Sequence, residues 1–497
     1  MGPLSKTATR ANLIAGSALI LCLWQGAAVA EPKTVSTYYP AFGHAVDAAL
    51  ANNGDVLVSL GGTAAAAGIQ IYSPSAGFAN PCGGGRYIDY AALGISTVEG
   101  IAVYPNGRRQ DASKTQSIAA AVEQNGAEFL RADLRRCAVD GAVNVEQDPI
   151  QGNSPGSFAV AITPRGQPTY AFVANEYGIA ATSRDSNMGE AGTVGIVRVR
   201  RADCGKFKKT TGVVPGIAYI YIPGANTVPG VTVSHDGKRL YVVNEGTAVG
   251  TYPPGHRYGG NLFRDPTGSG NPDLTTERCV NEYGKPTVGN TRNGVLTVID
   301  IAKAVAGRGQ HAIIQTIAAG CSPVRVVETR NGKFLFVASR GGNPGDVHST
   351  IAPVPGSVGR VLVFDTGKLL SRDLDKVNRG ALVNVMASGG TAPVGMALFR
   401  GDRRLAVANS NRFTQSGTGK TSVAILNVRC PTKTKGPEVV CESPQIGAFP
   451  RGLTADGSTL YVANFGSPSS NVPGSLQVIE YRAGKTSGCA VGPYPAP

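Results

Sequence analysis

The stretch PGVTVSHDGKRLYVVNE, residues 229–245, decides the fold of this chain. Apolar residues alternate with polar ones before Asp236-Gly237, and a mostly apolar run follows from Leu240 to Val243. Two such runs joined by an Asp-Gly pair predict a β-hairpin, because this pair readily adopts the backbone conformation of a tight turn. We therefore expect strands over residues 231–234 and 239–243.

The same hairpin pattern recurs along the chain. The further copies lie at 45–60, 98–134, 157–176, 323–340, 393–410 and 450–465, and the second of these is the most diverged. A third apolar run follows most hairpins, as over 294–301, and a fourth often precedes the next one, as over 313–317. Four antiparallel strands in each of seven units predict an all-β fold, a seven-bladed β-propeller of four-stranded antiparallel blades.

The segment Lys33–Tyr39, near the start of the mature chain, has the composition of a strand but no hairpin of its own. A ring of sheets closes only when its two ends meet. We therefore expect this segment to form the outermost strand of the last blade, beside 475–481. Residues 31–497 would then be a single propeller domain, with a long insertion at 246–293.

The first thirty residues have the pattern of a secretory signal. Lys6 and Arg10 precede an apolar run from Leu13 to Trp24, and the small residues Ala28-Val29-Ala30 follow. This order predicts a signal peptide over 1–30, cleaved after Ala30. The apolar run is short for a membrane span. We expect a soluble protein, secreted or periplasmic, with no transmembrane segment in the mature chain.

Cysteine usage agrees with export. Of nine cysteines, eight remain once Cys22 leaves with the signal, and an even number in an oxidising compartment predicts disulfide bonds. The sequence contains no Cys-x-x-Cys pair, so we expect neither a metal site nor a cofactor. The candidate pairs are Cys430 with Cys441 and Cys279 with Cys321. The pairing of the other four stays open: Cys82, Cys137, Cys204 and Cys489.

The formal charge of +14 falls to +12 when Lys6 and Arg10 are removed. A basic surface can attract polysaccharide, lipid headgroups or nucleic acid. Lys and Arg are scattered along the chain, however, apart from short clusters such as 206–209, and a solvated basic surface explains such scatter as well. We expect an anionic small molecule, glycan or protein as partner and no specific binding of nucleic acid.

The second strands carry a recognisable motif. LYVVN at 240–244 and LYVAN at 460–464, each after an Asp-Gly turn, resemble the YVTN-type propeller repeat. The family includes seven-bladed lactonase-like propellers and various secreted or surface proteins. The resemblance covers nearly all of the mature chain. It implies a fold rather than a function, because the motif records turn and strand packing.

Loop lengths indicate which face of the propeller binds. The connections between second and third strands are long, at 177–193, 246–293, 341–358, 411–420 and 466–474. In a propeller these connections emerge on one face, together with those that lead into the innermost strands. Long loops on a rigid scaffold often carry function. We expect the ligand site on this face, over the central channel, with 246–293 pinned as a lid by a Cys279–Cys321 disulfide.

Charged residues are expected at this channel mouth. Arg325 and Arg451 begin innermost strands and could clamp a carboxylate or phosphate. Alternatively, they pair with Glu176, Glu245 or Glu328 and only plug the channel. Residues that directly follow second strands would add charge around the mouth: Glu176, Glu245 and Arg340.

The resemblance also implies a possible enzymatic function, since lactonase-like propellers hydrolyse cyclic esters with acid–base and cationic residues at the channel mouth. His44, His256 and His348 are the candidate bases on the long-loop face. His235 belongs to a tight turn, where adjacent residues cannot form a catalytic relay. No catalytic motif carries over, so catalytic residues are unassigned. Two functions stay open, a binding or scaffold module and a lactonase-like hydrolase.

Overall fold

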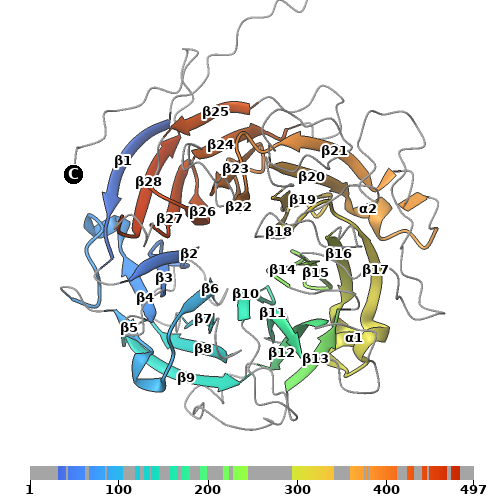
Figure 1. Ribbon diagram of the computed structural model, residues 1–497, viewed down its shortest axis with the longest axis horizontal. Coiled ribbons are helices and arrows are strands. Elements are labelled where there is room, and N and C mark those ends of the chain that lie inside the picture. The colour runs from blue at the N-terminus through green and yellow to red at the C-terminus, as the bar shows by residue number, and fades with distance from the viewer. Residues whose placement is uncertain are drawn as a thin grey trace, which may run out of the picture.

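The structure of the chain is a computed structural model. It describes residues 32–40, 43–61, 67–83, 87–103, 118–123, 128–134, 136–144, 157–164, 170–179, 191–198, 217–222, 228–244, 294–340, 359–373, 376–377, 380–410, 422–429, 439–444, 447–466 and 472–481. The elements of these segments are almost all β-strands, and they are arranged around a ring (Figure 1).

The described strands form seven four-stranded antiparallel sheets, numbered here in chain order from the first complete hairpin. Sheets 1 to 3 contain β2 (His44–Leu50), β3 (Val56–Gly61), β4 (Gly68–Tyr72), β5 (Ile88–Asp89); β6 (Val98–Val103), β7 (Ile118–Glu123), β8 (Glu128–Asp133), β9 (Ala138–Asn144); and β10 (Ser157–Ile162), β11 (Tyr170–Ile179), β12 (Ala191–Arg198), β13 (Ile217–Tyr221). Sheets 4 and 5 contain β14 (Gly230–Val233), β15 (Arg239–Asn244), β16 (Val295–Asp300), β17 (Ile313–Ala318); and β18 (Pro323–Glu328), β19 (Phe334–Ser339), β20 (Arg360–Asp365), β21 (Leu382–Ala387). Sheets 6 and 7 contain β22 (Pro393–Phe399), β23 (Arg404–Asn409), β24 (Ser422–Asn427), β25 (Val439–Pro444); and β26 (Pro450–Asp456), β27 (Thr459–Asn464), β28 (Ser475–Tyr481) with β1 (Pro32–Tyr38).

Short helices lie in the connections between third and fourth strands, except η2 (Ala91–Leu93), which lies between β5 and β6. They are α1 (Ile301–Val305) with the 3-10 helix η4 (Gly309–Ala312) in sheet 4, α2 (Thr366–Leu369) in sheet 5, and η1 (Pro74–Ala76) with η2 (Ala91–Leu93) around sheet 1. The prediction of an all-β propeller with antiparallel sheets is confirmed.

The hydrophobic core is divided among the interfaces between neighbouring sheets. In β15, Leu240 and Val242 pack toward sheet 3, whereas Tyr241 and Val243 pack toward sheet 5. Successive side chains of a strand point to opposite faces, so a strand that is covered on both faces needs apolar residues at every position. This packing explains the continuously apolar second strands.

The ends of the described chain meet in sheet 7. Strand β1 pairs antiparallel with β28, from Pro32 opposite Tyr481 to Tyr38 opposite Leu476. The Tyr38 ring stacks on Phe78 of the first sheet's outer loop, with ring centroids 4.3 Å apart. The N-terminal strand therefore contacts both sheets that flank the seam.

The Ser-His-Asp-Gly sequence forms a tight turn, as expected. Gly237 has a φ of 70° and donates its backbone N–H to the Ser234 carbonyl. The Ser234 hydroxyl donates to the Asp236 carboxylate at 2.7 Å. The side chains of Ser234 and Asp236 therefore stabilise the turn.

Strand β11 extends to Ile179 and β12 begins at Ala191, so the predicted loop over 177–193 is partly strand. Residues 1–30 lie outside the described residues, and the signal peptide stays a prediction. Among the described helices, none is long and apolar enough to cross a membrane.

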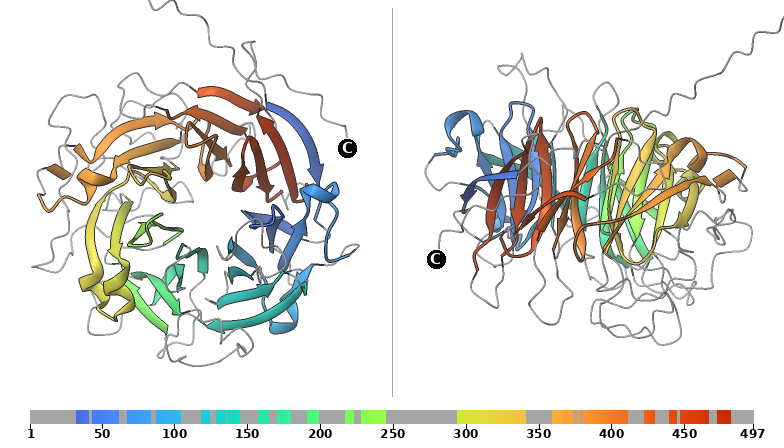
Figure 2. Two further views of the ribbon diagram at one scale, coloured as in Figure 1. Left: turned by 180° about the vertical axis from the view of Figure 1, so that it is seen from behind. Right: turned by 90° about the horizontal axis from the view of Figure 1, so that it is seen from above.

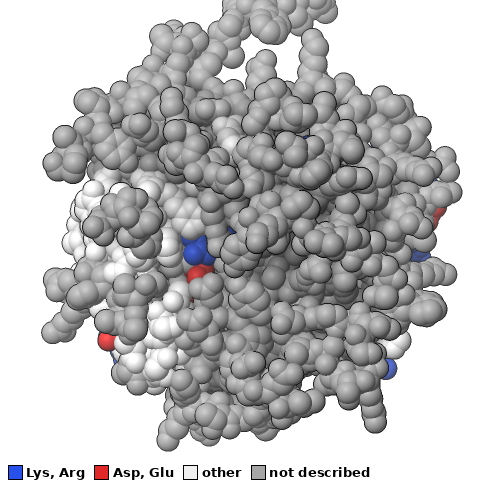
Figure 3. All heavy atoms as spheres, viewed as in Figure 1, with Lys and Arg blue, Asp and Glu red and all other residues white. Residues whose placement is uncertain are grey.

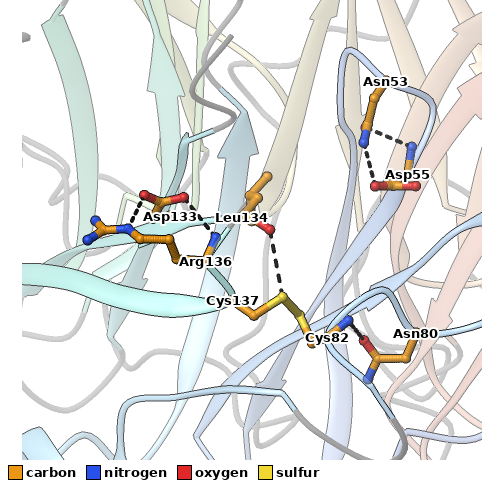
Figure 4. Close-up of a disulfide and its surroundings, with 8 residues drawn as sticks. All are labelled: Asn53, Asp55, Asn80, Cys82, Asp133, Leu134, Arg136 and Cys137. Atoms are coloured by element: carbon orange, nitrogen blue, oxygen red, sulfur yellow. Dashed lines mark hydrogen bonds and ion pairs between the residues drawn. A yellow bond between two sulfur atoms is a disulfide. The ribbon is translucent and has the colours of Figure 1, made fainter. Parts of the chain in front are cut away.

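The structure assigns one pairing that the sequence left open. Cys82, in the connection that leads to β5, forms a disulfide with Cys137 in the turn between β8 and β9 (Figure 4). Beside it, the Arg136 guanidinium donates to the Asp133 carboxylate at 2.6 Å. The disulfide links sheets 1 and 2.

Candidate functional site

The wall of the central channel is built from the first strand of each sheet. These are β2, β6, β10, β14, β18, β22 and β26, and each contacts the next around the ring. All begin at the end of the sheets where the second strands stop, which we call the loop face; the opposite end is the turn face. Edge-on, the sheets stand side by side between these two faces (Figure 2).

Irregular pairing recurs where innermost strands begin. In the register between first and second strands, a shift occurs at Ala45/Ala48, Val98/Ile101, Ser157/Ala159, Pro323/Arg325, Pro393/Gly395 and Pro450/Gly452. A β-bulge leaves a residue unpaired and re-aims its side chain. Phe158 and Arg451 are two such unpaired residues, and both take part in the cluster described next.

Arg451 forms an ion pair that crosses the channel. Its Nη2 lies 2.8 Å from Glu99 Oε2, so sheet 7 is joined to sheet 2. The two side chains are 10% and 2% exposed. The guanidinium also lies over the Phe158 ring of sheet 3, 5.2 Å from its centroid. Arg451 therefore spans the inner ends of several sheets.

Aromatic rings surround the same guanidinium. It lies 5.8 Å from the Phe449 ring centroid and 5.3 Å from that of Phe465. His44 stacks on Phe465 with centroids 4.6 Å apart, and His44 Nδ1 lies 2.6 Å from the Phe465 carbonyl oxygen. A carbonyl only accepts, so this bond places a proton on Nδ1 and leaves Nε2 of the neutral ring as an acceptor.

A second, looser ion pair lies beside the first. Arg325 Nη1 of sheet 5 is 3.6 Å from Asp47 Oδ2 of sheet 1, and the side chains are 21% and 12% exposed. Arg325 Nε also approaches the Val394 carbonyl at 3.5 Å. In the view down the ring axis, basic and acidic atoms of described residues meet near the centre of the face (Figure 3).

Glycines allow the strands of this wall to approach closely. A Cβ at Gly452 would overlap the Cα of Asp47, and one at Gly395 would overlap the carbonyl of Arg451. Sheets 6, 7 and 1 are thus in backbone contact below the two arginines. This contact fixes the backbone from which the Arg451 side chain emerges.

The predicted site residues divide into three groups. Arg325, Arg451 and His44 lie at the loop-face ends of their strands, β18, β26 and β2. Arg340 follows β19 and is buried, with its backbone N–H donating to the Ser322 carbonyl. Only the backbone of Glu176 is described, in β11, and Glu245, His256 and His348 lie outside the described residues.

The expectation that Glu328 pairs with a channel arginine is wrong. Glu328 lies at the turn-face end of β18, where it accepts from the His235 backbone N–H at 2.7 Å and from the Tyr241 hydroxyl at 3.0 Å. The acids that pair with the arginines are Asp47 and Glu99. Both belong to copies of the hairpin that match the repeat least well, so their position could not be predicted from the motif.

The predicted disulfides are tested only in part. Cys321 is buried just before β18 and is disulfide-bonded, and its partner is not among the side chains that the structure describes. Cys279 and Cys430 lie outside the described residues. Cys441 lies in β25 without a described side chain, so its pairing with Cys430 stays a prediction.

Within the described residues, no group of three or more His, Cys, Asp and Glu side chains is arranged to hold a metal ion. The described part of the channel mouth is instead a pair of arginine–carboxylate contacts with phenylalanine rings around one of them.

Comparison with known proteins supports the class of fold. The chain is similar to hydrazine synthase from Kuenenia stuttgartiensis, with 15% identity, a TM-score of 0.52, and coverage of 91% of this chain and 98% of that one. It is also similar to the β-propeller domain of Cps50 (Swd1) from Myceliophteria thermophila, with 10% identity, a TM-score of 0.51, and coverage of 91% and 100%. No protein-family model and no curated protein matches the sequence. At these identities the likeness establishes a β-propeller and nothing about a ligand.

Proposed function

We propose that this protein is an exported binding or scaffold module. It is a seven-bladed YVTN-type propeller, closed by β1, which binds an anionic ligand on the loop face over the channel. The observation that carries the proposal is the Arg325–Asp47 contact, a 3.6 Å ion pair with both side chains partly exposed. Export is supported by the signal-like pattern of residues 1–30 and by the Cys82–Cys137 disulfide.

The two arginines have different roles in this proposal. Arg451 is held by Glu99 at 2.8 Å and surrounded by aromatic rings, so it forms the floor of the site. Arg325 is more exposed, and its contacts to Asp47 and Val394 are long. A guanidinium has five N–H donors in a planar fork that matches carboxylate and phosphate. Arg325 is therefore the group that recognises the ligand.

The experiment is a binding measurement on the secreted protein. Inorganic phosphate, citrate and a hexuronic acid serve as probes, with the rise in thermal unfolding temperature as the readout. Arg325→Gln should abolish any shift produced by the wild type. Arg136→Gln is the matched control, because Arg136 is exposed at the outer edge of sheet 2, and it should keep the shift. Equal shifts for both variants would overturn the assignment of Arg325.

One observation favours the lactonase-like hydrolase as an alternative. The Phe465 carbonyl holds His44 with Nε2 as an acceptor, which is the orientation that a general base requires. A screen with γ-butyrolactone and an aryl acetate decides between the two functions. Hydrolysis that is lost in His44→Ala and kept in His235→Ala would establish the enzyme. No hydrolysis by the wild type would leave the binding module.

A further inference from the structure

The turn face of sheets 4, 5 and 6 is densely basic. Eleven Lys and Arg residues in the described part of these sheets are exposed and lie in first-to-second or third-to-fourth strand connections. They are Lys238, Lys303, Arg308, Arg330, Lys333, Lys368, Arg372, Lys376, Arg400, Arg403 and Arg429. In an antiparallel sheet these two kinds of connection emerge at the same end. We call these eleven residues the basic face.

Contacts between the connections confirm that they share one end. The backbone N–H of Ile301, at the start of α1, donates to the Lys238 carbonyl. In sheet 5 the Thr366 N–H donates to the Lys333 carbonyl, and in sheet 6 the Val428 N–H donates to the Arg403 carbonyl. In each of the three sheets, the third-to-fourth strand connection is thus hydrogen-bonded to the first-to-second strand turn.

Most of the described acidic side chains on this face accept hydrogen bonds from backbone N–H groups. Asp300 and Asp365 cap α1 and α2 by accepting from Lys303 and Lys368 backbone N–H groups. Asp402 accepts from the Arg330 backbone N–H at 2.6 Å. Only Asp236 and Asp373 are exposed acids among the described residues of these connections. The exposed charge is therefore strongly positive.

The same end of sheets 7 and 1 has the opposite character. Its described turns, over 456–459 and 51–55, carry Asp456 and Asp55 and contain no Lys or Arg. Sheet 2 contributes one described basic residue to this end, the exposed Arg136 between β8 and β9, so most of the described cations at this end belong to sheets 4, 5 and 6.

We propose that the basic face docks the protein onto a membrane surface that is rich in anionic lipid headgroups. The cations come from separate connections spread over three sheets, so a flat anionic surface can meet them together, whereas a linear polyanion meets only a strip. Nucleic-acid grooves commonly add aromatic stacking platforms. The large exposed hydrophobic side chains among the described residues, Tyr39 and Val472, adjoin strand ends at the loop face. Binding is therefore electrostatic, without insertion.

This orientation has a consequence for the channel site. The turn face would lie against the membrane, and the loop face with Arg325 would point away from it. The inference does not depend on the ligand proposed for the loop face. A protein that binds no small anion could still dock in this way, and the two proposals fail in different experiments.

The test is sedimentation of the mature protein with vesicles. We expect binding to vesicles made of equal parts phosphatidylglycerol and phosphatidylcholine, none to phosphatidylcholine alone, and release as salt is raised. Each Lys or Arg near an anionic surface contributes roughly fivefold in affinity, so Lys238→Gln, Lys333→Gln, Lys368→Gln and Lys376→Gln combined should weaken binding about a hundredfold or more.

The matched control replaces the same four lysines with arginine, which keeps the charge and should keep the binding. Thermal unfolding of both variants checks that they fold, and the salt release of the wild type is independent of any variant. Three results would overturn the proposal. They are equal binding to both kinds of vesicle, unchanged binding of the glutamine variant, and binding to heparin or RNA without binding to anionic vesicles.

Discussion

Arg451 and Glu99, which are 352 positions apart in the chain, form a 2.8 Å ion pair across the inner ends of sheets 7 and 2. Both side chains are nearly buried, so little solvent screens the attraction between the two charges. Removing one member of such a pair commonly costs about 3–5 kcal/mol, because the remaining charge is left buried and uncompensated. We expect Arg451→Met to lower the free energy of unfolding by about this amount. Chemical denaturation of the mature protein measures the change.

A double-mutant cycle separates the ion pair from the packing of Arg451 on its aromatic neighbours. The single variants are Arg451→Met and Glu99→Gln, and the double variant combines them. We expect the double variant to be less destabilised than the sum of the two single changes, because no uncompensated charge remains. Strict additivity would show that the two side chains do not interact.

Close approach of neighbouring innermost strands leads to a second prediction. A Cβ at Gly100 would lie 2.7 Å from the Cα of Ala159, and one at Gly452 would overlap the Cα of Asp47. Because backbone atoms cannot swing aside, Gly100→Ala and Gly452→Ala should each destabilise the protein by about 1–3 kcal/mol, as in other overpacked interiors. Gly367→Ala, in α2, is the control and should have little effect. Unfolding free energies that do not distinguish Gly452→Ala from the control would contradict the packing described.

The Cys82–Cys137 disulfide closes a loop of 55 residues between sheets 1 and 2. A covalent link of this span restricts the unfolded chain, and its removal typically costs about 2–4 kcal/mol. We expect the Cys82→Ser and Cys137→Ser double variant to unfold at lower denaturant concentration than the wild type. Peptide mapping without reduction should recover the two cysteines in one linked peptide. Recovery of either as a free thiol from the exported protein would rule out the bond.

Local signals made much of the fold predictable. The hairpins at 231–243 and 450–464 could be assigned because an Asp-Gly pair and the apolar runs beside it lie within a few residues of each other. The expected N-terminal strand at 33–39 corresponds to β1, which spans Pro32–Tyr38. The end of β11 could not be predicted, because residues 177–179 have no apolar alternation that separates strand from loop.

The candidate site was predictable only in part. Arg325 and Arg451 could be placed near the channel because both belong to well-matched repeats. Their partners could not be named, because Asp47 and Glu99 are distant in sequence and occur in diverged repeats. Glu328 was a wrong candidate because of its position in β18, three residues from Arg325. Successive side chains of a strand alternate between its two faces, so an odd spacing places these two on opposite faces.

His235 and Glu328 join the turns of sheets 4 and 5, and their contact should make stability depend on pH. The hydrogen bond to Glu328, with His235 Nδ1 3.0 Å from its carboxylate, raises the pKa of His235 above its ordinary 6.5, and Asp402 adds to this while Arg330 opposes it. A raised pKa means that the stabilisation is complete below the unfolded-state pKa and is lost as the pH rises through the folded-state value. We expect the wild type to lose its advantage over His235→Gln across this window. Tyr241→Phe is the control. Burial raises the pKa of Tyr241 above its ordinary 10.0, so the hydroxyl stays protonated throughout, and removing it should lower the free energy of unfolding by the same amount at each pH. A constant difference between wild type and His235→Gln in denaturation from about pH 5 to 8 would contradict the coupling.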